Sequence, residues 1–167
     1  MSRDSSTPGY LIHLSGTAIV SDWLSGHPSG TLNPKIWSDV NSIDEITSLP
    51  EKGTIHRTTE KMIQDAAVAH GDKLKTAIVC PPPIYGTGKG LGRMQTVFYR
   101  DFWTEIQKVG APFYVADGSS VQSQTHILDV VDVYMKLVQA AVAGSGSADW
   151  GKDVSNLHAV KLLANER

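Results

Sequence analysis

The fold is decided by the stretch Ile78–Gly90, which reads IVCPPPIYGTGKG. The residues at 75–80 are mostly apolar, which is typical of a strand buried on both faces of a parallel sheet. The three prolines at 81–83 have no backbone N–H, so the strand has to end there. Because ligands in open α/β sheets bind beyond the carboxyl ends of the strands, we predict that residues 81–92 form the ligand-facing loop.

The preceding segments predict a strand, a helix and the strand at 75–80 in succession. Residues 10–14 form an apolar run, read as a buried strand, that ends in a Ser-Gly-Thr turn at 15–17. Thr54 is a suitable N-cap for a helix from residue 55 to about residue 70. This order forms a right-handed crossover between parallel strands, which places the chain in the α/β class.

The second half of the chain predicts two more helices and two short strands. Apolar residues recur at helical spacing over 94–109, where we expect them to cover the core, and Gly110 ends that helix. Residues 113–115 and 125–128 are interpreted as strands, and Asp129 as the cap of a final helix.

We expect one ordered body, residues 9–151, with a small substrate-side lobe at about residues 86–128. The polar lead, residues 1–8, is expected to be disordered. Residues 152–167 are too polar for a buried parallel strand and lack helical periodicity, so a flexible or divergent tail is expected.

Composition narrows the classes of function. The 167 residues are 41% hydrophobic, with a net charge of −2 and a pI near 6.3, which indicates neither a nucleic-acid partner nor an anionic membrane. The single cysteine, Cys80, is interpreted as a core residue of a cytoplasmic protein, and no residues have metal-ligand spacing. No apolar run reaches the roughly 18 residues of a membrane span, and the N-terminus is not a secretory signal.

Four segments in this order carry a family resemblance: residues 12–18, the helix with Lys61, residues 82–86 and residues 125–132. Together they resemble the second half of an extended short-chain dehydrogenase/reductase of the NAD-dependent epimerase/dehydratase group. Fungal epimerase-like reductases are the most similar, through the Ser-Gly-Thr turn and the His-Arg before the lysine helix. The resemblance implies part of a Rossmann-type, doubly wound parallel sheet.

The resemblance implies roles for five residues. Thr17 falls on the catalytic Ser/Thr, and Lys61 on the catalytic lysine that also binds the ribose. Pro82, Ile84 and Tyr85 fall on the loop beside the nicotinamide of NAD or NADP, where Tyr85 is also a candidate acid. The structural alternatives are a turn residue for Thr17, a solvated helix lysine for Lys61 and a packing residue for Tyr85.

Two features of the chain depart from the family. Arg57 stands four residues before Lys61, where the family has its catalytic Tyr; a guanidinium cannot exchange that proton but can bind an anion. Arg57 and His126 are therefore candidate substrate-binding residues, with a surface arginine and a structural histidine as the alternatives. The dinucleotide-binding glycine fingerprint is missing, because the glycines at 86–92 have the wrong spacing, so weak or absent cofactor binding by this chain is expected.

Two functions remain open. The first is an NAD(P)-dependent oxidoreductase or epimerase-like protein that acts on a carbonyl or carbinol of a small metabolite. The second is a truncated or inactive family member that binds a ligand or a partner. An unpaired sheet edge would allow homo- or hetero-association in either case.

Overall fold

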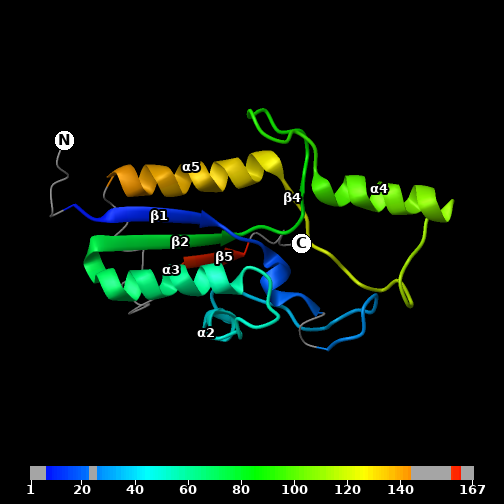
Figure 1. Ribbon diagram of the computed structural model, residues 1–167, viewed down its shortest axis with the longest axis horizontal. Helices are drawn as coiled ribbons and strands as arrows, with labels where there is room; N and C mark the ends of the chain where they lie inside the picture. Colours follow the sequence, from blue (N-terminus) through cyan, green and yellow to red (C-terminus); the bar gives the residue numbers. More distant parts are fainter. Residues whose placement is uncertain (1–6, 23–25, 144–158, 163–167) are drawn as a thin grey trace.

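The computed structural model describes residues 7–22, 26–143 and 159–162. Its main sheet has three parallel strands in the order β1-β2-β5 (Figure 1). A second, two-stranded parallel sheet pairs β3 with β4. The strands are β1 (Gly9–Leu14), β2 (Leu74–Cys80), β3 (Ile84–Tyr85), β4 (Thr125–His126) and β5 (Ala159–Leu162). The predicted α/β class with a partial Rossmann-type sheet is confirmed.

The two long helices of the body lie on opposite sides of the main sheet, with α5 beside β1 and α3 beside β2 (Figure 1). The helix α4 lies apart from the main sheet, on the side toward which the arrow of β1 points in Figure 1. The helices are α2 (Ile43–Thr47), α3 (Arg57–His70), α4 (Val97–Val109) and α5 (Ile127–Ala143), with 3-10 turns η1 (Thr17–Val20) and η2 (Gly71–Lys73). None of the helices in the described ranges is long and apolar enough to cross a bilayer.

The core lies between β2, α3 and the segment that links β1 to α3. Residues 76–80 of β2 are all buried, as the apolar run predicts. The linking segment contributes Ile46 from α2, with Trp37 and Leu49 packed against the cluster. The buried cluster consists of Ile19, Ile46, Ile63, Ile78 and Cys80.

The first strand and the crossover helix differ in detail from the sequence prediction. β1 was predicted to be buried, but Leu11 and Leu14 are 39% and 51% exposed, because within the described residues β1 is an edge strand. The helix α3 begins at Arg57 rather than residue 55, because His56 has a left-handed φ of 69° that interrupts the helical conformation. Thr54 is therefore not its N-cap.

The lobe differs more strongly. No residue of α4 is buried, so this helix does not cover the core as predicted, although Gly110 does end it. Its aromatic side chains pack locally instead: Phe98 stacks on Phe102 at 6.4 Å and Phe102 contacts Phe113 at 5.6 Å between ring centroids. Residues 113–115 form no strand, and the strand predicted at 125–128 ends at His126, where α5 begins.

The expected tail also needs a correction. Ala159–Leu162 form β5, which pairs in parallel with Ala77–Cys80 of β2, so the expectation that residues 152–167 contain no strand is wrong for these four residues. The polar residues of this segment led to the expectation, but backbone pairing to a central strand needs only a short extended segment. The rest of that tail and the lead at residues 1–6 lie outside the described residues.

Candidate functional site

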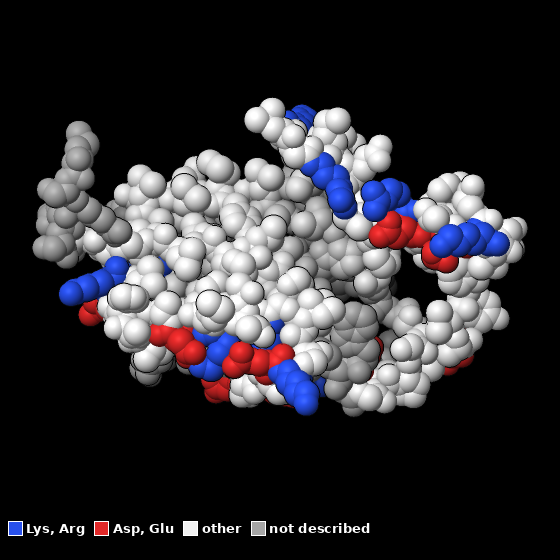
Figure 2. All heavy atoms as spheres, in the orientation of Figure 1, with Lys and Arg blue, Asp and Glu red and all other residues white. Residues whose placement is uncertain are grey.

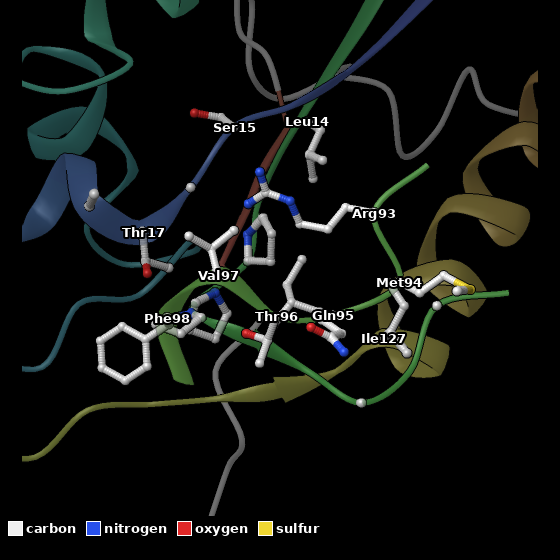
Figure 3. A pocket seen from close by; sticks show the side chains of 18 residues that line it. Leu14, Ser15, Thr17, Arg93, Met94, Gln95, Thr96, Val97, Phe98 and Ile127 are labelled. Carbon is white, nitrogen blue, oxygen red and sulfur yellow. The ribbon is translucent and has the colours of Figure 1, made fainter. Parts of the chain in front are cut away.

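A cavity of about 460 Å³ lies where β1 and β2 end, between the proline loop and the start of α4 (Figure 3). This is the position at which open α/β sheets bind ligands. Of the predicted loop, the three prolines, Ile84, Gly86 and Gly88 line it. The other lining residues are Leu14, Ser15, Gly16, Thr17, Ala18, Arg93, Met94, Gln95, Thr96, Val97, Phe98 and Ile127.

The turn after β1 is fixed to the proline loop by the backbone. The Ser15 N–H donates to the Val79 carbonyl at 2.8 Å, and the Thr17 N–H to the Pro81 carbonyl at 3.1 Å. Gly16 lets the His56 imidazole approach, since a Cβ on Gly16 would lie 3.2 Å from its Nε2. The turn therefore holds Thr17 at the cavity, and within the described ranges the Thr17 hydroxyl has no hydrogen-bond partner.

The buried carboxylate of Glu60 holds this turn from the side away from the cavity. The Ser15 hydroxyl donates to Glu60 Oε1, and Figure 3 shows it directed away from the cavity. Glu60 is only 1% exposed, and its Oε2 lies 3.9 Å from the Arg57 guanidinium, which supplies the opposite charge that a buried carboxylate needs. The Cys80 Sγ is 3.7 Å from Glu60 Oε1. Ser15 therefore anchors the turn rather than facing a ligand.

Cys80 is not a nucleophile in this structure. Its burial, and then the charge of Glu60, raise the pKa of the thiol to about 12. The thiolate is the reactive form, and at neutral pH it is essentially absent. The structure thus places Cys80 in the core, as the sequence indicates.

Arg57 does not have the surroundings of the predicted anion clamp. It is 2% exposed, and its Nε donates to the Leu49 carbonyl at 2.9 Å. Its Nη1 donates to Gln64 Oε1 at 2.9 Å, and its Nη2 donates to the Thr47 carbonyl. The guanidinium thus satisfies carbonyls at the end of α2 and has no face open to a substrate. We correct its role to a structural one.

Lys61, Tyr85 and His126 lie outside the cavity lining. Lys61 is a half-exposed residue of α3 that pairs with Asp65 one turn later. Tyr85 and His126 contact each other edge to face with 5.1 Å between ring centroids. The His126 Nδ1 accepts a hydrogen bond of 3.3 Å from the Leu128 N–H, in the first turn of α5. Of the predicted site residues, the structure brings Thr17, Pro82 and Ile84 together.

Three features of the site were missed from the sequence alone. Glu60 carries no sequence signal that separates it from a surface helix acid, and only the fold shows that it is buried and bonded to Ser15. Arg93 directly follows the predicted ligand loop, so extending that loop by one residue would have found it. The lining from Met94 to Phe98 was assigned to the core because its apolar spacing suits a buried helix face.

The described residues fit one end of a nicotinamide dinucleotide and not the other. Pro82 and Ile84 give an apolar wall that suits a flat ring. The phosphates would need free backbone N–H groups or cations. The Gly88 N–H already donates to the Met94 carbonyl at 3.0 Å, and the Lys61 ammonium pairs with Asp65. Within the lining Arg93 is the single cation, so the described residues offer the phosphates one charged contact and not the glycine-rich turn of a dinucleotide site.

Among curated proteins, the chain is similar to one named as the oxidase ucsJ of an Acremonium species. The two are 30% identical over 143 residues, which cover 84% of this chain and 40% of that protein. No family model matches the chain, and no solved structure matches it. The comparison shows an oxidoreductase-type relative, and this chain spans well under half of its length.

Proposed function

We propose that this chain forms the substrate side of an oxidoreductase that acts on a carbonyl or carbinol of a small metabolite. The observation that carries the proposal is the Thr17 hydroxyl, which has no hydrogen-bond partner among the described residues and lies at a cavity beyond the ends of β1 and β2. The relative named as an oxidase supports the reaction class. The resemblance to the epimerase/dehydratase group supports the same class and leaves epimerisation as a variant of it.

In this proposal each group of lining or supporting residues has a separate role in holding the substrate. The Thr17 hydroxyl would form a hydrogen bond with the substrate oxygen and fix its direction. Ser15 and Glu60 would keep the turn in place, because their buried hydrogen bond fixes the residue two positions before Thr17. Ile84 and the prolines would exclude water from the reacting carbon.

A nicotinamide cofactor, NAD or NADP, would supply the hydride in this proposal. Pro82 and Ile84 would border its ring, whereas its phosphates would be held outside the residues described here. Lys61 would have to leave Asp65 to reach a ribose, and Tyr85 would have to turn from His126 to act as an acid. We therefore assign the substrate contact to Thr17 and keep the roles of Lys61 and Tyr85 as secondary hypotheses.

The test is a comparison of Thr17→Val with Thr17→Ser in reduction of small ketones at millimolar NADH or NADPH, because this chain is expected to bind the cofactor weakly. Valine keeps the shape of threonine and removes the hydroxyl, so kcat/KM should fall by about 100-fold. Serine keeps the hydroxyl and should retain most of the activity. A Thr17→Val protein with unchanged kcat/KM would refute the assignment of Thr17.

Partner binding through the edge of the main sheet is a second candidate function. Among the described residues β1 pairs with β2 alone, and Leu11 and Leu14 are partly exposed. On the adjoining helix α5, Val131 and Met135 are 45% and 50% exposed. On the face that Figure 2 shows, charged side chains gather over α4 and along the α3 side, and few are visible over α5. A chain that remains monomeric by light scattering at all accessible concentrations would count against self-association.

A further inference from the structure

One side chain gives the cavity its charge. Of the 18 residues that line it, Arg93 alone is ionisable as a base, and no Asp, Glu, Lys or His is among them. Arg93 comes from the glycine-rich loop between β3 and α4. Nothing in the lining offsets its charge, so the lining has a net positive charge that attracts an anionic ligand.

The guanidinium of Arg93 is directed into the cavity. Figure 3 shows the side chain crossing from its loop toward Leu14 and Ser15 at the end of β1. Within the described ranges Arg93 forms neither an ion pair nor a hydrogen bond through its side chain. By contrast, Arg100 on the outer part of α4 pairs with Asp101 at 2.9 Å. In the part of the chain that the structure describes, Arg93 is thus a cation without a partner, aimed at the space where a substrate would lie.

The rest of the lining restricts what this cation can bind. Ile84, Met94, Val97 and Phe98 are apolar, so the cavity suits a ligand with an apolar body. The planar guanidinium fork matches a carboxylate, with two parallel N–H···O bonds. A single cation balances a single negative charge, which favours a carboxylate over a phosphate or a pyrophosphate.

We propose that the substrate is an organic acid with an apolar body, and that Arg93 binds its carboxylate while Thr17 binds its carbonyl or hydroxyl oxygen. This inference rests on the proposed function, since it names the substrate class of the same site. Because Arg93 lies at the exposed rim of the cavity, its attraction for the carboxylate weakens as salt is added.

The experiment compares 4-oxo-4-phenylbutanoate with its neutral methyl ester, by calorimetric titration of the full chain at low and moderate salt. We expect the acid to bind about tenfold more tightly than the ester, as a charge-assisted hydrogen-bonded pair predicts, with a smaller ratio at higher salt. Arg93→Gln should bring the two affinities together. Arg93→Lys keeps the charge without the fork and should give an intermediate ratio. Arg100→Gln, a matched change outside the cavity, should keep the preference of the unmodified protein.

Three results would overturn the inference: equal affinity for acid and ester, binding of neither, or an acid preference that survives in Arg93→Gln. The assignment of the reaction is tested separately by turnover. Reduction of the ester with no preference for the acid would overturn the carboxylate site and leave the proposed function standing. Arg93-dependent binding of the acid without turnover of either compound, at a cofactor concentration where titration shows NADH or NADPH bound, would support the carboxylate site and count against the proposed function.

Discussion

Replacing Arg57 by methionine tests whether this residue is structural. The change removes the donors to the Thr47 and Leu49 carbonyls and the cation beside Glu60, all at a position that is 2% exposed. Leaving a buried charge without its partner costs about 3–5 kcal/mol, a large part of the roughly 5–15 kcal/mol that stabilises a typical domain. With a denaturant slope of about 2 kcal/mol/M, the urea midpoint should fall by about 2 M.

The assay is equilibrium unfolding in urea, followed by far-UV circular dichroism and by tryptophan fluorescence, since Trp37 packs against the core. Arg100→Met is the matched control, because its exposed pair with Asp101 should contribute less than about 1 kcal/mol. Adding Glu60→Gln to Arg57→Met should restore part of the lost stability by removing the unpaired charge. A midpoint for Arg57→Met within about 0.3 M of the unmodified protein would refute the structural role and reopen the anion clamp.

Three other predictions concern the core thiol, the ligand loop and the cofactor. Burial raises the pKa of the Cys80 thiol from 9.0 to about 12 on folding, so the unfolded chain loses this proton first as the pH rises. The free energy of unfolding should therefore fall above pH 9 by up to about 1.4 kcal/mol per pH unit. Cys80→Ala should flatten this dependence between pH 9 and 10 in unfolding experiments. Gly86→Ala should lower the midpoint of thermal unfolding, at a cost of about 1–3 kcal/mol, because Gly86 has a φ of 98° and a Cβ there would lie 2.4 Å from His126 Nε2; Gly90→Ala, with nothing within 4 Å, is the control, and equal midpoints would contradict this geometry. Titration of the chain with NADH or NADPH should give weak binding or none, since the glycine fingerprint is missing and the Gly88 N–H and Lys61 are already bonded, and low-micromolar affinity would show that other groups hold the phosphates.

The sequence was sufficient where one pattern admitted one structure. The apolar run before three prolines predicts a buried strand that ends at the prolines. The structure has β2 there, and the cavity lies at the end of this strand, as predicted. Thr17 was a different case: the family resemblance named it, and the structure places it at the cavity because its turn directly follows β1. These features depend on neighbours in sequence and on the general geometry of parallel sheets.

The sequence was insufficient where a side chain could face several directions. Spacing alone put Arg57 and Lys61 on one face of a helix, but the start of α3 at Arg57 and the position of α2 decide that Arg57 is buried and Lys61 is not. The apolar spacing in α4 also suits a helix whose aromatic residues pack on one another and on a nearby loop. β5 was missed because four residues are too few to show a period.

The two-stranded sheet has a consequence for how the substrate range of such a protein can change. Residues 86–124, which include α4 and much of the cavity wall, leave from β3 and return to its neighbour β4. The ends of this excursion are therefore held together by the β3–β4 pairing whatever lies between them. The entropy of closing such a segment grows only slowly with its length. One wall of the cavity can thus be lengthened, shortened or exchanged as a cassette, while Thr17 and the proline loop on the opposite wall stay where they are.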